Sequence, residues 1–111
     1  MVFALIGEMW FSTAARRDTV LSNTQQYLVN HPAQWDVTTL SSVTAKTGDP
    51  AIFFTVRFLA QADRDQMITD LQGFAVGARA PIAGSWVEPH TCDHDEVSIE
   101  ACTPDARVVW V

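Results

Sequence analysis

The sequence predicts one α+β domain in which an antiparallel sheet carries two helices on one face. Its hydrophobic patterns follow the order strand, helix, strand, strand, helix, strand, which is the order of the split βαβ fold. With 111 residues, of which 48% are hydrophobic and 18% charged, the chain has the length and composition of a single compact domain. We therefore expect residues 1–111 to form a ferredoxin-like sandwich with an extra C-terminal strand or hairpin.

The first strand and the first helix are both clear in the pattern. Residues 2–11 are apolar on both alternating faces, as in a central strand. Ser12 and Thr13 can cap a helix over 14–30, and Pro32 ends it because the residue before proline avoids the helical region. The apolar positions of this helix are Val20, Leu21, Thr24, Tyr27 and Leu28.

The middle of the chain predicts a hairpin and a second helix. The Thr- and Ser-rich segment 35–46 is typical of a half-exposed edge strand, and a turn leads from it into an apolar strand over 51–60. Asp63 and Gln66 form a pattern like a capping box, which predicts a helix start there. The apolar face of this helix would be Met67, Ile68, Leu71 and Phe74.

The C-terminal third predicts shorter elements. Residues 75–84 contain two glycines and a proline without a regular period, so we expect a loop. Segments 85–92 and 96–102 predict a hairpin around a polar turn, and 107–111 predicts an added edge strand.

The two faces of the predicted sheet differ in character. The more uniformly apolar face should carry the helices; its residues are Phe3, Leu5, Met9, Phe11, Ile52, Phe54, Val56 and Phe58. On the opposite, helix-free face, Glu8 and Arg57 could pair across neighbouring strands and form a polar pocket floor. The residues expected to bind a ligand there are Glu8, Trp10, Phe53, Thr55, Arg57, Glu88 and His90. The alternative is a structural ion pair, with Trp10 and Phe53 covered by a second subunit.

Residues 89–96, PHTCDHDE, raise the question of a metal site. His90 and Cys92 would project from one side of a strand, and His94 would lie in the turn. Zinc needs about four converging ligands, whereas side chains in a row along one strand do not converge. We therefore expect a strand end and an acidic turn, and no metal.

The register of the predicted terminal hairpin follows from its apolar positions. It places Cys92 opposite Val97, and Cys102 on the other face, so we expect two free thiols. Glu88 and His90 would share a face and could form a pair suited to proton transfer. The alternative is a solvated Glu88 beside a histidine that is hydrogen-bonded and packed.

Charge and hydropathy exclude some partners. The net charge is −6 and the seven basic residues are scattered, which argues against nucleic acid. No stretch approaches the roughly 20 apolar residues of a membrane helix. The apolar first eleven residues lack a basic leading segment and contain Glu8, which favours a strand over a secretion signal. We expect a soluble, cytoplasmic protein.

These observations lead to a ranking of functions. We expect a protein that binds a small apolar or aromatic molecule, or an enzyme of such compounds that needs no cofactor. Because ferredoxin-like domains often dimerise face to face, a homodimer would close the pocket on the helix-free face. The alternative is an interaction module without catalysis that uses this face or the terminal strand. A metal protein using His90, Cys92 and His94 is a third hypothesis.

Overall fold

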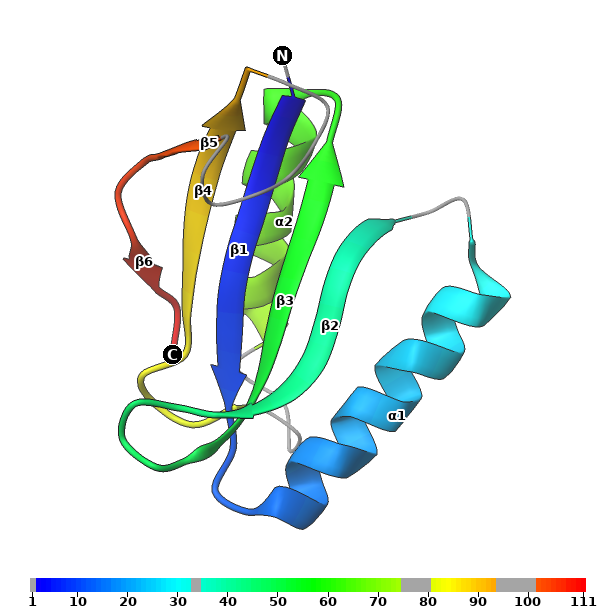
Figure 1. Ribbon diagram of the computed structural model, residues 1–111, viewed down its shortest axis with the longest axis vertical. Coiled ribbons are helices and arrows are strands. Elements are labelled where there is room, and N and C mark those ends of the chain that lie inside the picture. Colours follow the sequence, from blue (N-terminus) through cyan, green and yellow to red (C-terminus); the bar gives the residue numbers. More distant parts are fainter. Residues whose placement is uncertain (1, 33–34, 75–80, 94–101) are drawn as a thin grey trace.

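The computed structural model describes residues 2–32, 35–74, 81–93 and 102–111. Figure 1 shows the elements of this part of the chain in order. They are β1 (Val2–Trp10), α1 (Ala14–Asn30), β2 (Asp36–Thr44), β3 (Pro50–Phe58), α2 (Gln61–Phe74), β4 (Trp86–Cys92), β5 (Cys102–Pro104) and β6 (Val108–Val109).

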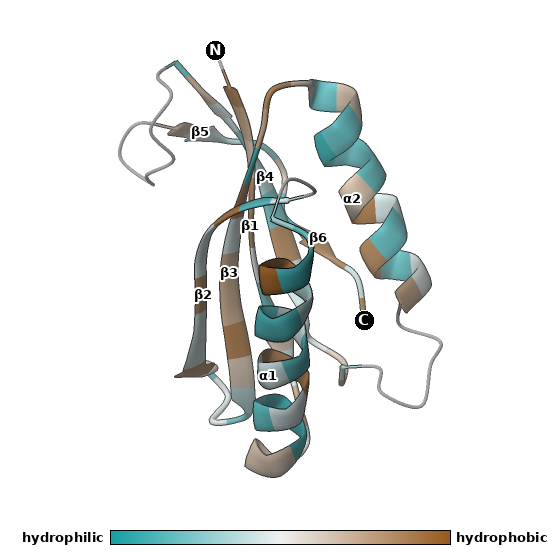
Figure 2. Cartoon of the chain, turned by 90° about the vertical axis from the view of Figure 1, so that its right-hand side faces the viewer, coloured by the Kyte–Doolittle hydropathy of each residue, from teal (hydrophilic) through white to brown (hydrophobic). Residues whose placement is uncertain are grey.

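The strands form one antiparallel sheet with the order β2-β3-β1-β4-β5, and β6 pairs with the other end of β4. Figure 2 shows both helices on the same side of this sheet. The predicted ferredoxin-like sandwich with extra C-terminal strands is therefore confirmed. The helix-covered face is the predicted one, because Leu5 lies opposite Val56 and Met9 opposite Ile52, and all four belong to the main core.

The helix boundaries follow local signals in one case and not in the other. Thr13 caps α1 as predicted, since its side chain accepts a hydrogen bond from the Arg16 amide at 3.2 Å. The helix α2 begins at Gln61, two residues before Asp63. Asp63 therefore lies inside the first turn, where its negative charge interacts favourably with the positive end of the helix dipole. The predicted start of the helix at Asp63 is wrong.

A buried arginine joins α2 to the sheet. Arg64 is 3% exposed, and its Nη1 donates to the carbonyl of His90 at 3.0 Å. The same guanidinium lies 5.5 Å from the centre of the Phe3 ring and forms ion pairs with Asp65 and Asp105. These contacts satisfy a charge that would otherwise be costly to bury, and they hold the first turn of α2 against β1 and β4.

The cysteine prediction is wrong, because Cys92 and Cys102 form a disulfide. They are partners in the β4–β5 ladder, whereas the predicted register placed Cys102 opposite Val87. The two registers differ by five residues along β4. An odd shift moves a side chain to the other face of the sheet, which is why the two thiols meet. Most of the predicted strand 96–102 lies outside the described residues, and the described part of β5 extends two residues past it, to Pro104.

The C-terminal segment is an added strand, as expected. Val108 and Val109 pair with Val87 and Trp86. The amide of Trp110 donates to the carbonyl of Ser85 at 3.0 Å, and the Trp110 side chain is buried in the main core. No helix in the described part of the chain is long and apolar enough to cross a membrane.

Candidate functional site

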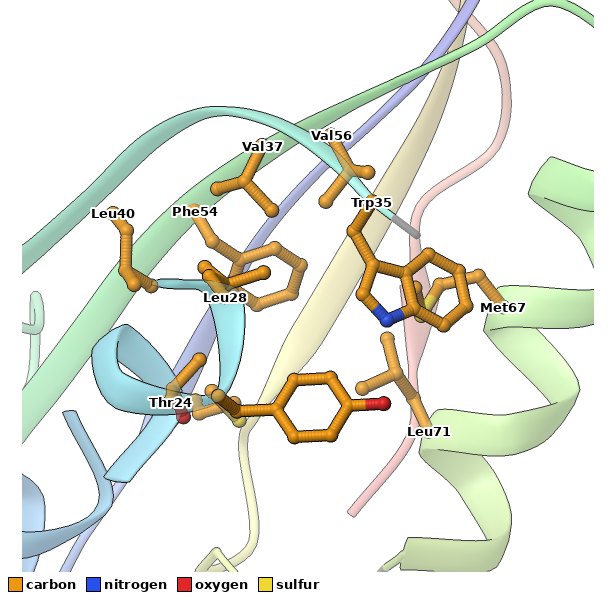
Figure 3. Close-up of a pocket in the computed structure, with 11 residues that line it drawn as sticks. Thr24, Leu28, Trp35, Val37, Leu40, Phe54, Val56, Met67 and Leu71 are labelled. Carbon is orange, nitrogen blue, oxygen red and sulfur yellow. The ribbon is translucent and has the colours of Figure 1, made fainter. Parts of the chain in front are cut away.

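An apolar cavity of about 170 Å³ lies between the two helices and the helix-covered face of the sheet (Figure 3). Strands β1, β2 and β3 supply its floor, and one turn of each helix supplies its walls. The residues that line it are Met9, Thr24, Tyr27, Leu28, Trp35, Val37, Leu40, Phe54, Val56, Met67 and Leu71. Three aromatic rings and two flexible thioethers in one small apolar space are typical of a site for an apolar ligand.

The cavity exists because the helix layer does not close completely over the sheet. Within α1 the only buried residue is Val20, and within α2 it is Arg64. Tyr27 is 42% exposed and Leu28 and Leu71 are half-buried, although all three line the cavity. Protein interiors are close-packed and rarely contain a cavity of this size. The incomplete helix layer is therefore an unusual feature of this molecule.

The floor of the cavity depends on a glycine in β1. Gly7 lies opposite Phe54, and a Cβ atom at Gly7 would be 2.7 Å from the end of the Phe54 ring. The same Cβ would be 2.7 Å from the carbonyl oxygen of Trp86 and 2.8 Å from a methyl group of Val87. The absence of a side chain at Gly7 therefore lets the ring of Phe54 lie close over β1.

Trp35 stands where the apolar cavity meets a polar hollow. Trp35 and Met67 line both spaces. The hollow, of about 290 Å³, is otherwise lined by Asp36, Arg57, Phe58, Asp63, Gln66 and Asp70. In it Arg57 Nε donates to Asp36 at 2.7 Å, and Gln66 donates to Asp70 at 3.0 Å. A ligand in the cavity would thus have an apolar body inside and a polar environment at the Trp35 end.

The predicted pairing of Glu8 with Arg57 is wrong. The register places Glu8 opposite Phe53 and Arg57 opposite Ala4, so the two residues lie four positions apart, about 13 Å along β1. Arg57 forms an ion pair with Asp36, its cross-strand partner on β2. Glu8 accepts a hydrogen bond from the indole of Trp10, its neighbour on the same face, at 2.9 Å.

The predicted proximity of Glu88 and His90 is confirmed. His90 Nε2 and Glu88 Oε1 are 2.9 Å apart, and Arg107 donates to the other oxygen of Glu88 at 3.2 Å. The Arg107 guanidinium also lies 3.8 Å from the centre of the Trp86 ring. His90 is 2% exposed, and among the described residues its Nδ1 has no hydrogen-bond partner. Burial of the imidazole leaves a substrate no access, which favours a structural role for this pair.

The other residues predicted on the helix-free face have structural contacts. Thr55 is buried, and its hydroxyl lies 2.5 Å from that of Thr38 on β2. The Trp10 ring occupies the space where a Cβ of Gly84 would be, and Gly84 has a φ of +108° that favours glycine. Phe53 is half-buried. The structure thus gives Trp10 and Thr55 partners within the chain.

The metal hypothesis loses one of its three ligands. The Cys92 sulfur is in the disulfide and has no thiolate to offer, and His94 lies outside the described residues. In the described ranges no three His, Cys, Asp or Glu side chains are grouped closely enough to hold a metal ion.

Most of the cavity residues lie on the predicted apolar faces of strands and helices, whereas Trp35, Val37 and Leu40 lie in the segment predicted as a half-exposed edge strand. None of them was predicted as a site. One signal could have identified them. The apolar stripe of α1 contains Thr24 between Val20 and Tyr27, and it has few large side chains to fill the layer beneath it. A stripe that is too small for the sheet below it predicts either a gap or a ligand.

Comparison with known proteins leaves the fold and the cavity as the basis for any function. No family model, curated protein or solved structure matches the chain. The class that the structure defines is a ferredoxin-like α+β sandwich with an apolar cavity between its helices and its sheet.

Proposed function

We propose that this protein binds a small apolar or aromatic molecule in the cavity between α1, α2 and the sheet. The observation that carries the proposal is an aromatic-lined apolar space of about 170 Å³ in a chain whose two helices leave most of their apolar residues half-buried or exposed. A ligand there would complete the packing that the helices leave unfinished, and its burial would stabilise the fold through the hydrophobic effect.

The volume limits the size of the ligand. An apolar cavity of about 150 Å³ in a protein core is known to accept benzene, whereas drug-sized pockets begin at about 300 Å³. A ligand with one ring or two fused rings therefore fits. For nine carbon atoms at roughly −0.5 kcal/mol each, the dissociation constant would be about 0.5 mM.

The proposed site lies on the opposite face of the sheet from the pocket expected from the sequence. The centre of the helix-free face is already covered within one chain, since Ala4, Ile6 and His90 are 0%, 4% and 2% exposed. This burial leaves little room there for a ligand enclosed by two subunits. The homodimer itself remains a prediction, with the rest of that face as its interface.

Two further expectations change with the structure. The terminal strand is paired with β4 and anchored by buried Trp110, which weakens its role as a free docking strand. The disulfide between Cys92 and Cys102 favours an oxidising compartment over the cytoplasm, where thiols are kept reduced.

The proposal is tested by filling the cavity. Leu71→Trp places a large side chain in the cavity, and we expect it to reduce the affinity for indane by more than tenfold in isothermal titration calorimetry. Ile68→Trp is the matched control, because Ile68 is also half-buried on α2 and packs on the core without lining the cavity. Equal affinity of both variants, or no binding to the unmodified protein, would contradict the proposal.

A further inference from the structure

We propose that Trp35 selects the ligand of this cavity by donating its indole N–H to a hydrogen-bond acceptor. The preferred ligand is then a small neutral ring compound that carries a carbonyl group or a comparable acceptor. This inference rests on the proposed function and adds the chemical class of the ligand and the residue that recognises it.

The indole N–H of Trp35 is a donor that faces an apolar space. It makes no hydrogen bond to any residue that the structure describes, although the ring packs against the main core. In Figure 3 the nitrogen of Trp35 points toward the space between Leu28 and Leu71. Trp35 is half-buried, and its Nε1 is not among the fully buried side-chain nitrogens that lack a partner, so this N–H is open to an acceptor carried by a ligand.

The other polar side chains of the cavity are already engaged within the protein. The hydroxyl of Thr24 donates its hydrogen to the carbonyl of Val20 at 2.8 Å. Tyr27 has partners within the chain, one of which is His31, on which its ring stacks with a centroid distance of 4.2 Å. Among the described residues that line the cavity, Trp35 is thus the one whose side-chain donor has no hydrogen-bond partner, and we assign to it the distinction between a ketone and a hydrocarbon.

Charge at the Trp35 end of the cavity selects against anionic ligands. Asp63 and Asp70 line the adjoining hollow, and the positive charge of Arg57 is paired with Asp36 at 2.7 Å. The whole chain carries a net charge of −6. A ligand carboxylate at this end would meet like charges, whereas a neutral acceptor would not.

Three probes with the same ring system test the inference by calorimetry: indane, 1-indanone and indane-2-carboxylate. The affinity of 1-indanone relative to indane should fall by about two- to tenfold in Trp35→Phe, because one net hydrogen bond is lost. Comparing this ratio between proteins cancels the different hydration of the two probes. Trp86→Phe is the matched control, since Trp86 lies on the helix-free face beneath Arg107, and its ratio should equal that of the unmodified protein.

A second measurement does not depend on the variant's folding. In the unmodified protein labelled with ¹⁵N, 1-indanone should shift the indole N–H proton of Trp35 downfield, and indane should not. An equal response to both probes, with an unchanged affinity ratio in Trp35→Phe, would overturn the role of Trp35 while leaving the cavity as a binding site. Failure of indane and 1-indanone to bind at all would instead overturn the proposed function. Binding of the carboxylate as tightly as the ketone would overturn the selection for neutral ligands.

Discussion

Gly7 shows how one residue determines the shape of the proposed site. A methyl group at this position would meet Phe54, Trp86 and Val87, all within 2.8 Å. We expect Gly7→Ala to lower the free energy of unfolding by about 1–3 kcal/mol, the usual cost of overpacking a close-packed interior, and to push the Phe54 ring into the cavity. Urea denaturation would measure the loss.

The matched control for this prediction is Gly73→Ala in the last turn of α2. A Cβ at Gly73 would meet no atom within 4 Å, and alanine is the better helix former, so this variant should be as stable as the unmodified protein or slightly more stable. If Gly7→Ala matched Gly73→Ala in stability and in indane affinity, the close approach of Phe54 to β1 would contribute neither to the free energy of unfolding nor to the shape of the cavity.

Single residues also show which parts of the candidate site a sequence can predict. Glu88 and His90 alternate along one strand, so their shared face follows from the strand period alone, and the predicted contact exists. Glu8 and Arg57 are on different strands, and whether they meet depends on register, which the alternation of apolar residues left open by several positions. Pairs within an element were predictable, and pairs between elements were not.

At the scale of elements, the register between β4 and β5 explains why the disulfide was not predicted. The apolar alternation of residues 85–92 and 96–102 predicted a hairpin with Cys92 opposite Val97. In the structure Cys92 lies opposite Cys102. An error of five positions in the register changed both the pairing and the chemistry of the two cysteines.

We expect this disulfide to stabilise the domain. It joins residues ten positions apart, and closing a loop of that length should contribute roughly 2–3 kcal/mol by restricting the unfolded chain. Denaturation with and without reductant would measure the difference. The double variant Cys92→Ala, Cys102→Ala is the control, because reductant should leave its stability unchanged. Two titratable thiols in the denatured, unreduced protein would show that the bond does not form.

At the scale of the whole molecule, the sequence predicted the topology and missed the cavity. Hydrophobic periods and turns predict the order and type of the elements, and the sheet order followed from the split βαβ pattern. Whether two helices fill the space above a sheet depends on side-chain volumes in three dimensions. This packing leaves residues of α1 and α2 half-buried and a cavity between the helices. The hydrophobic periodicity of the sequence cannot predict it, because periodicity carries no information on how side-chain volumes fit together.

The oligomeric state decides what the helix-free face does. Phe53 and Trp86 on this face are half-buried in the single chain, and we expect a second copy to cover them. Light scattering coupled to size exclusion should then give about twice the 12.3 kDa mass of one chain across a dilution series. Phe53→Asp should shift the protein to monomer, because it would place an unpaired charge in the interface, opposite the carboxylate of Glu8 on β1.

Val29→Asp is the control for this variant, since Val29 is 73% exposed on α1 and lies in the helix layer, away from the proposed interface. It should leave the mass unchanged. Both variants should bind indane as the unmodified protein does, because neither residue lines the cavity. A monomer at every concentration would contradict the dimer without affecting the ligand site, since ligand binding and dimerisation are assigned to opposite faces of one sheet. Loss of indane binding together with the dimer would instead mean that the cavity keeps its shape only when the helix-free face is covered.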